Sequence, residues 1–246
     1  MTQLNPTLRA VTHDLVAANR ILAAEGVVDA FGHVSGRHPQ HADRFILSRA
    51  LSPELIGPAD LIEYHLDGTP VDPNAPKGYL ERFIHGAIYE ARPDVHSVVH
   101  NHSRSVIPFT VSSVKLRPIV HSCAVIGRDV PVWDPQSRFG DTTLLISDME
   151  MARDFAGVLA KNRGALMRGH GCTVTGKSVR EAVYTAVYLE VNANLQLQAS
   201  RFPPVKYLTD GEIELICRRL ADAKPGEGYD RAWNYWCSRA GIDPVA

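Results

Sequence analysis

Apolar residues recur at every third or fourth position near the start of the chain, between Leu8 and Glu25. This spacing places the apolar side chains on one face of a helix. Gly26 follows, and glycine often stands just beyond a helix because it readily takes up the left-handed backbone conformation. The pattern predicts a first amphipathic helix that ends at about Glu25.

Short apolar segments separated by turn residues come next, at residues 30–37, 45–48 and 61–66. Asp67-Gly68 follows the last of them, and this dipeptide is common in the tight turns of hairpins. Segments of this length bounded by turn residues are typical of β-strands. This part of the chain is predicted to form a small antiparallel sheet.

Residues 81–92 return to helical spacing, and Pro93-Asp94 breaks the pattern. The segment from Val95 to His100 is rich in β-branched residues, which favour buried strands. The order is therefore a helix, then a strand, with a histidine at the end of the strand.

Two further helices are predicted in the second half of the chain, at residues 148–162 and 179–199. Each follows a Ser-x-x-Glu sequence, which is typical of a helix N-terminus because the two side chains bond the free backbone N–H groups. Between the helices, Gly164 is expected to end the first one, and residues 165–168 form a short strand. That strand leads into Gly169-His170-Gly171.

The chain after Phe202 differs in character from the rest and contains a short predicted helix at residues 212–223. An aromatic cluster follows: Tyr229, Trp233, Tyr235 and Trp236. We expect one domain over residues 1–246, with a tail from about residue 203 that packs on the body or on a neighbouring subunit.

Composition is that of an ordinary globular protein, with 246 residues, 45% hydrophobic and 22% charged. The formal net charge is −1 and the basic residues form no cluster, so neither nucleic acid nor a membrane surface is an expected partner. No segment reads as a signal peptide or a membrane span. Four widely spaced cysteines suggest neither a zinc ribbon nor a disulfide framework, which favours a cytoplasmic location.

Three histidines stand out among the 11 in the chain. His100 and His102 are two residues apart, so on an extended strand both side chains leave the same face. His170 lies between two glycines at a predicted strand end, where the missing Cβ atoms let another element approach closely. Three imidazoles could therefore meet, although a His-x-His pair by itself is as often structural as it is metal-binding.

Three neutral imidazoles leave open positions on a divalent ion, as in catalytic metal sites. We expect one ion per subunit, Mn or Zn, with Fe or Co as alternatives. Glu81, at the start of the helix before the His-x-His strand, is a candidate for a further ligand or for a proton carrier. Its structural alternative is an ordinary glutamate in the first turn of a helix.

These residues resemble the class II aldolase and adducin superfamily, which includes L-fuculose-phosphate aldolase and L-ribulose-phosphate 4-epimerase. The resemblance covers roughly residues 15–199 and rests on these motifs: Gly32-His33-Val34-Ser35, Glu81 opening a helix, Arg92-Pro93-Asp94 before Val99-His100-Asn101-His102, and Gly169-His170-Gly171. It implies an α/β fold, an α/β/α sandwich around a largely antiparallel sheet. It also implies that the three matching histidines bind the metal, that the matching glutamate is the catalytic acid/base, and that the chain forms a homotetramer or higher homo-oligomer with interfacial active sites.

The chain departs from the aldolases where they bind the substrate phosphate. Small and hydroxylated residues there are replaced by Arg49-Ala50 and Tyr79-Leu80, and a proton-donating tyrosine after His121 is replaced by Ser122. Arginine pairs with carboxylates through two parallel bonds, and a tyrosine suits a flat ring. The expected substrate is an aromatic carboxylate.

Gly32-His33-Val34-Ser35 and Ser48-Arg49 are similar to the branch that decarboxylates hydroxylated aromatic acids, such as 3,4-dihydroxyphthalate and hydroxy-methylpyridine-dicarboxylate. The resemblance implies a metal-dependent, non-oxidative decarboxylase of a hydroxylated aromatic or pyridine carboxylic acid. Glu81 or His33 would supply the ring proton, with a pKa shifted towards neutrality.

Arg49 would hold a carboxylate, and the other candidate substrate-binding residues are Ser48, Tyr79 and His121. Structural alternatives stay open, namely a surface ion pair for Arg49, a turn hydrogen bond for His33 and a strand end for His121. The alternative functions are an aldolase acting on a sugar phosphate or hydroxy acid, a mononuclear iron oxygenase of aromatic acids, and an adducin-like interaction module. The complete histidine set and Glu81 argue against the last.

Overall fold

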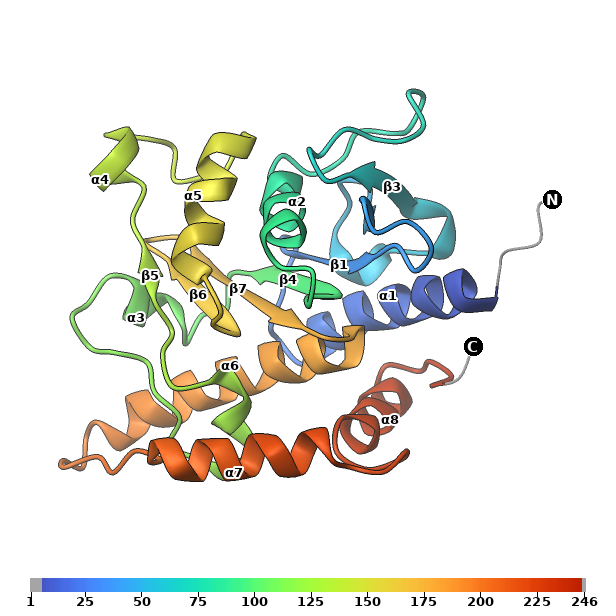
Figure 1. Cartoon of the computed structure of the whole chain (residues 1–246). Helices are drawn as coiled ribbons and strands as arrows, with labels where there is room; N and C mark the ends of the chain where they lie inside the picture. Colours follow the sequence, from blue (N-terminus) through green and yellow to red (C-terminus); the bar gives the residue numbers. More distant parts are fainter. Residues whose placement is uncertain (1–5, 245–246) are drawn as a thin grey trace.

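The computed structural model describes residues 6–244. Its strands are β1 (His33–Arg37), β2 (Arg44–Ser48), β3 (Leu61–His65), β4 (Ser97–Asn101), β5 (Val132–Trp133), β6 (Gly164–Met167) and β7 (Gly171–Gly176). Within the described residues they form one seven-stranded sheet in the order β3-β2-β1-β4-β7-β6-β5 (Figure 1). Every neighbouring pair is antiparallel except β5 and β6, so the sheet is largely antiparallel.

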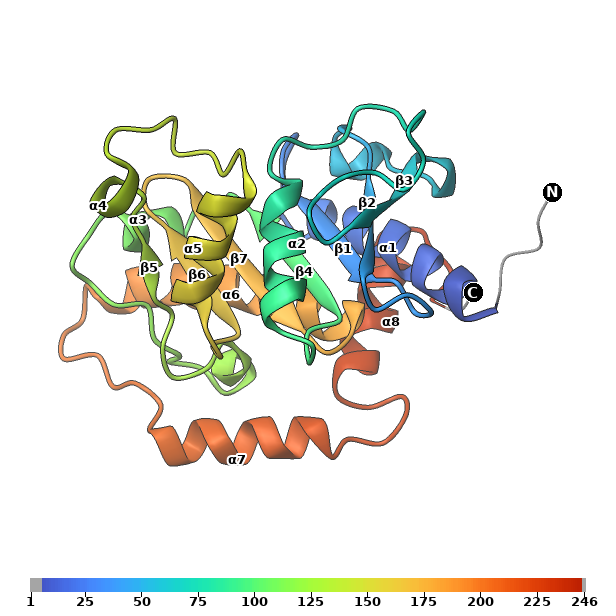
Figure 2. The same cartoon turned by 45° about the horizontal axis from the view of Figure 1, so that its top comes forward.

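Helices α2 (Arg82–Ala91) and α5 (Met149–Leu159) cover one face of the sheet (Figure 2). In α2, Ile84 and Ile88 are four residues apart and lie on the face that meets the sheet. Both are fully buried, together with Phe155 of α5, in one apolar core. Burying a side chain of this size stabilises a fold by roughly 1.5–3 kcal/mol, and this core holds the start of α2 against the centre of the sheet.

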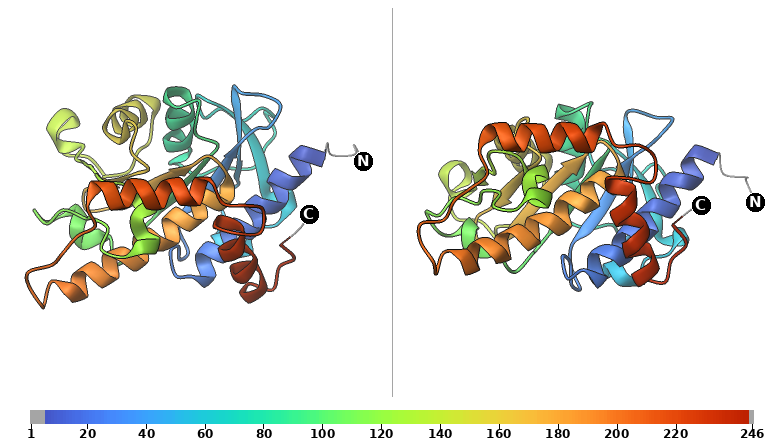
Figure 3. Two further views of the ribbon diagram at one scale, coloured as in Figure 1. Left: turned by 60° about the horizontal axis from the view of Figure 1, so that its bottom comes forward. Right: turned by 90° about the horizontal axis from the view of Figure 1, so that it is seen from below.

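The opposite face is covered by α1 (Pro6–Ala24) and α6 (Val179–Ala199), with a second apolar core beneath them. Gly26 follows α1 with φ of +70°, as expected for a glycine that ends a helix. Helices α7 (Asp210–Ala221) and α8 (Tyr229–Arg239) lie outside this layer (Figure 3). Trp233 and Trp236 of α8 are buried against α1 and α6 and join the same apolar core.

Several local features differ from the sequence expectations. Asp148, rather than Ser147, caps α5, and its carboxylate accepts from the Met151 N–H. Gly164 begins β6 instead of ending the helix, because α5 already stops at Leu159. The aromatic cluster of the tail forms a helix that the pattern did not predict. Short elements also went unpredicted: η1 (Pro53–Leu55), η2 (Pro58–Asp60), α3 (Ile107–Thr110), η3 (His121–Ile126), β5 and α4 (Gln136–Phe139).

Helices therefore lie on both faces of a mixed but mostly antiparallel sheet, which confirms the predicted α/β/α sandwich. No helix within residues 6–244 has both the length and the apolar character needed to cross a bilayer. The sheet brings the ends of β4 and β7 to the start of α2, and the predicted functional residues gather at this junction.

Candidate metal centre and active site

The junction of β4 and β7 determines where the three histidines lie. His100 belongs to β4, His102 follows the end of that strand, and His170 lies in the turn between β6 and β7. Asn101 pairs with Cys172 across the two strands. A Cβ atom on Gly171 would overlap the Asn101 carbonyl oxygen, so only glycine lets the turn that carries His170 come this close to His102.

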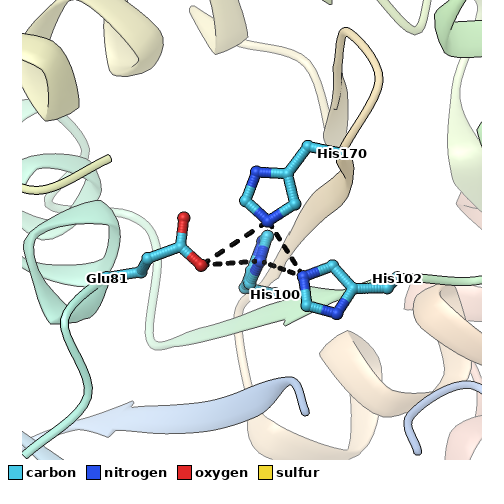
Figure 4. Close-up of side chains that lie close together, drawn as sticks. All are labelled: Glu81, His100, His102 and His170. Carbon is cyan, nitrogen blue, oxygen red and sulfur yellow. Dashed lines mark hydrogen bonds and ion pairs between the residues drawn. The ribbon is translucent and has the colours of Figure 1, made fainter. Parts of the chain in front are cut away.

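Four side chains converge at this point, as Figure 4 shows for Glu81, His100, His102 and His170. The Nε2 atom of His102 is 3.2 Å from that of His100 and 2.9 Å from that of His170. The Glu81 Oε2 atom is 3.5 Å from the Nε2 atoms of both His100 and His170. The ligand atoms of the four residues all lie within 4.8 Å of one another, so the group could hold a metal ion.

The outer nitrogens of two of these rings indicate how their protons are arranged. The Nδ1 atom of His170 is 3.0 Å from the Leu144 carbonyl oxygen, which can only accept, so this nitrogen carries the proton. The Nδ1 atom of His100 faces the Thr173 hydroxyl oxygen at 3.2 Å, while that hydroxyl donates to the Met167 sulfur. Both rings then direct the lone pair of Nε2 inward. This is the tautomer that metal-binding histidines adopt, so the donor set fits a divalent ion.

Glu81 stands immediately before α2, and its two carboxylate oxygens face different partners. Oε1 accepts from the Ile146 N–H at 3.2 Å, which holds the group in place, while Oε2 faces the histidines. Burial opposes ionisation of Glu81, but the nearby His100 and His170 outweigh it and lower the pKa to about 2. The expected shift towards neutrality is therefore wrong for Glu81, because the imidazoles favour its charged form.

His33 of β1 lies beside this group, since its Cα pairs with that of His100 on the neighbouring strand. Its ring centroid is 5.1 Å from that of His100 and 4.6 Å from that of Tyr79. Burial, followed by the neighbouring histidines, lowers the pKa of His33 well below its ordinary value. His33 is thus a neutral imidazole, and the expected shift towards neutrality is wrong here too.

His85 was not singled out from the sequence, but in the structure it contacts His33 through its ring nitrogen Nε2 and thereby adjoins the site. Its Nε2 atom lies 2.7 Å from His33 Nδ1, and its Nδ1 atom lies 2.6 Å from Ser35 Oγ. His85 is completely buried in α2. The sequence spacing could have indicated this position, because His85 is four residues after Glu81 and therefore lies on the same face of the helix.

Ser48, the last residue of β2, and Arg49 after it lie near Tyr79, whose ring is next to that of His33. Ser48 donates to the Tyr79 hydroxyl at 3.3 Å, and that hydroxyl donates to the Leu51 carbonyl. The Arg49 Nε atom bonds the Asp60 carboxylate at 2.6 Å. The ion pair that was the structural alternative for Arg49 is thus present, while Nη1 and Nη2 have no hydrogen-bond partner within residues 6–244.

His121 lies elsewhere in the chain. It begins η3 and lines a cavity of about 700 Å³ with residues of α7, the loop after it and α8, among them Leu215, Arg218 and Arg231. The expectation that His121 lines the same pocket as the other residues is not met within one chain. The reason is that η3 packs against α6 and α7, on the face of the sheet opposite α2.

Comparison with known proteins places this arrangement in a family. Residues 13–197 match the family model described as the class II aldolase and adducin N-terminal domain. The chain belongs to the class II aldolase and adducin family. Its fold, the gathering of Glu81 with the three histidines, and the family match all agree with the resemblance drawn from the motifs.

Two relatives within this family are named for the same type of reaction. The decarboxylase tropJ of Talaromyces stipitatus is 40% identical over 194 residues, which is 74% of this chain and 73% of the relative. The 3,4-dihydroxyphthalate decarboxylase of a Terrabacter species is 30% identical over 250 residues, covering 94% of this chain and 98% of the relative. The expectation of a lyase from the decarboxylase branch of the class II aldolase and adducin family is confirmed at this level.

A solved structure supports the fold of the class II aldolase and adducin family. An aldolase II superfamily protein from Pseudomonas syringae superimposes with a TM-score of 0.79 over 97% of this chain and 94% of that protein, at 24% identity. At this identity the likeness concerns the fold alone. It confirms that the sandwich and its antiparallel sheet are those of the family.

Proposed function

We propose that the protein is a metal-dependent, non-oxidative decarboxylase of a hydroxylated aromatic or pyridine carboxylic acid. The observation that carries the proposal is the convergence of three imidazole side chains on the carboxylate of Glu81. The decarboxylase names of tropJ and of the Terrabacter relative support the reaction type. The bulky residues at the positions of the aldolase phosphate site support an aromatic substrate.

His100, His102 and His170 would hold one divalent ion per subunit, Mn or Zn, with Fe or Co as alternatives. When bound, such an ion supplies Lewis acidity, which stabilises negative charge on substrate oxygens. The inward-facing lone pairs of His100 and His170 suit this role because their Nδ1 protons already have acceptors. The site then keeps open positions for the substrate.

Glu81 would move the proton in this mechanism. With a pKa of about 2 it is ionised at neutral pH, so it accepts the proton of the substrate's ring hydroxyl. The ring–carboxylate bond then breaks, carbon dioxide leaves, and the electron pair remains on the ring carbon. Glu81 returns its proton to that carbon, and the phenolate regains a proton from water.

Arg49, Tyr79 and Ser48 would recognise the rest of the substrate. Asp60 occupies the Nε of Arg49, so the Nη1 and Nη2 edge is left to pair with a carboxylate. The Tyr79 ring, held by Ser48 and by the Leu51 carbonyl, offers a flat apolar surface beside His33. His121 has no role in a site built from one chain. Assembly into a homotetramer or higher homo-oligomer, and a cytoplasmic location, remain part of the proposal.

The experiment measures carbon dioxide release and dioxygen consumption together, with metal-loaded protein and a series of ortho-hydroxylated aromatic mono- and dicarboxylates. We expect carbon dioxide release without dioxygen consumption. Fuculose phosphate and ribulose phosphate serve as competitors, and they should inhibit weakly. Coupled dioxygen consumption would instead indicate an oxygenase, and tight binding of the sugar phosphates without any response to the aromatic acids would indicate an aldolase.

Arg49→Lys tests the carboxylate contact within the same series. Lysine keeps the charge but cannot form two parallel bonds, so we expect kcat/KM to fall about 10-fold or more for dicarboxylates. Arg44→Lys is a matched control, because Arg44 begins β2, the strand that ends just before Arg49, and its side chain pairs with Glu63. An equal effect of both substitutions would contradict the role of Arg49.

A further inference from the structure

A row of buried polar side chains runs from the site into the core between β1 and α2. His33 Nδ1 faces His85 Nε2 at 2.7 Å, His85 Nδ1 faces Ser35 Oγ at 2.6 Å, and Ser35 Oγ faces the Tyr89 hydroxyl at 2.8 Å. All four side chains are at most 4% exposed. We call this row the His33 relay. The mechanism proposed above uses none of the three residues behind His33.

The Tyr89 end of the His33 relay determines which way its protons point. Tyr89 is only 1% exposed, and the one hydrogen-bond partner of its hydroxyl within residues 6–244 is Ser35 Oγ. The phenol proton is then directed at Ser35 Oγ, its only acceptor among the described residues. In the opposite arrangement the phenol proton would be buried without an acceptor, which folded proteins avoid.

The remaining protons follow from this start. Ser35 donates to His85 Nδ1, so a neutral His85 carries its proton on Nε2 and donates it to His33 Nδ1. A neutral His33 must then carry its proton on Nε2. That nitrogen has no partner within residues 6–244, and its ring lies between Tyr79 and His100.

We propose that Tyr89, Ser35 and His85 act as positioning residues that hold His33 in the Nε2–H tautomer, so that His33 donates a hydrogen bond to the substrate beside the three-histidine centre. The inference rests on the proposed function for the identity of the substrate oxygen. It separates two roles, because Glu81 transfers the proton while His33 stabilises the charge that develops as carbon dioxide leaves. A neutral imidazole suits this second role because it donates without giving up its proton.

The test is spectroscopic and needs no substrate. The full chain, labelled with ¹⁵N-histidine and loaded with Zn²⁺, is studied by long-range ¹H–¹⁵N correlation, which distinguishes protonated from unprotonated ring nitrogens. The His33 signals are those lost in His33→Asn. We expect a protonated Nε2 and an unprotonated Nδ1 in the wild type. The reverse pattern would overturn the proposal, whatever substrate the enzyme proves to use.

Ser35→Ala breaks the His33 relay in its middle with a small change of volume. His85 Nδ1 then loses its donor, so we expect a mixture of His33 tautomers. Tyr89→Phe removes the donor at the other end of the His33 relay, and we expect it also to give a mixture of His33 tautomers. Tyr64→Phe is its matched control, because both rings pack on Phe45 but the Tyr64 hydroxyl has no hydrogen-bond partner within residues 6–244. Tyr64→Phe should leave the His33 signals unchanged, and a tautomer shift of equal size in this control would count against a specific relay.

Turnover provides the second readout. We expect Ser35→Ala and His85→Leu to lower kcat about 10- to 100-fold with KM changed less than about threefold. Losses of this size are typical when a residue that orients a side chain of a metal site is removed. His85→Gln should recover most of the rate, because its amide can donate to His33 and accept from Ser35. An unchanged kcat in Ser35→Ala, with the His33 tautomer altered as expected, would overturn the role of His33 as a donor. If no aromatic acid is turned over, the proposed function fails, while the spectra still decide the tautomer.

Discussion

Glu81 is the residue whose surroundings constrain its chemistry most. Its carboxylate is held by the Ile146 N–H and faces His100 and His170, and its pKa is lowered to about 2. A group with this pKa is a proton acceptor at neutral pH, and it becomes a donor only after it has taken a proton from the substrate. This order of events distinguishes it from an acid that starts protonated.

Glu81→Gln should therefore keep the metal and lose most of the rate. The amide oxygen can still accept from Ile146, so the shape of the site survives, but an amide cannot take up the proton. We expect kcat to fall about 100- to 10,000-fold. Glu90→Gln, on the same helix but in an exposed pair with Arg153, should leave kcat unchanged. A normal rate in Glu81→Gln would show that Glu81 takes no part in proton transfer and is an ordinary glutamate at the start of a helix.

The three histidines predict a loss of metal when any one of them is removed. His100→Ala, His102→Ala and His170→Ala each take away one of three ring ligands, and we expect metal content measured by elemental analysis to fall well below one ion per chain. His96→Ala is the control, since His96 is exposed just before the same strand. Full occupancy in all three variants would contradict the metal-site assignment.

At the level of elements, the contact between the end of β4 and the start of β7 brings the site together. Asn101 and Cys172 face each other there, and Gly171 leaves room for the Asn101 carbonyl. The candidate metal ligands lie next to this contact, with His100 and His102 at the end of β4 and His170 just before β7. Whatever separates the two strands moves His170 away from His102.

Gly171→Ala tests this dependence. Its Cβ would push against the backbone of Asn101, so we expect a loss of about 1–3 kcal/mol in the free energy of unfolding and weaker metal binding. Gly157→Ala is the contrasting variant, because Gly157 lies inside α5 with open space at its Cβ position. It should stabilise the protein by up to about 1 kcal/mol. Equal stability of the two variants would show that the β4–β7 contact tolerates a side chain.

For the whole molecule, the buried His85 links stability to pH. Burial, followed by the charge of His100, lowers its pKa to about 3, against an ordinary value near 6.5. Between these pH values the unfolded chain binds a proton on this ring and the folded chain does not. The free energy of unfolding must then decrease as the pH falls from about 6.5 towards 3, by about 1.4 kcal/mol per pH unit for this one group.

His85→Gln removes this titration while keeping the hydrogen bonds. Urea unfolding in the presence of a chelator, from pH 7.5 downwards, should therefore show that the free energy of unfolding falls less steeply with pH in the variant. The difference in slope should correspond to about one proton taken up on unfolding. The chelator removes the separate effect of metal release. Parallel curves for the two proteins would show that His85 is protonated in the fold as easily as in the unfolded chain.

The sequence by itself determined the elements with strong periodicity and the identity of the candidate metal ligands. Helix α1, the strands β1 to β4 and the capped start of α6 follow from local patterns, because spacing and capping act within a few residues. The His-x-His pair predicted two side chains on one face, since strand geometry is local as well. The family motifs added the fold and the reaction type.

Only the tertiary structure decided how these groups behave. The pKa of Glu81, the partnership of His33 with His85, and the distance of His121 from the site all depend on residues far apart in the chain. Electrostatic shifts and hydrogen bonds act through space and grow with burial, and burial is settled only when the sheet and its helices pack together. The short elements near residues 121–139 were missed for the same reason, because their conformation follows from packing and not from a pattern of their own.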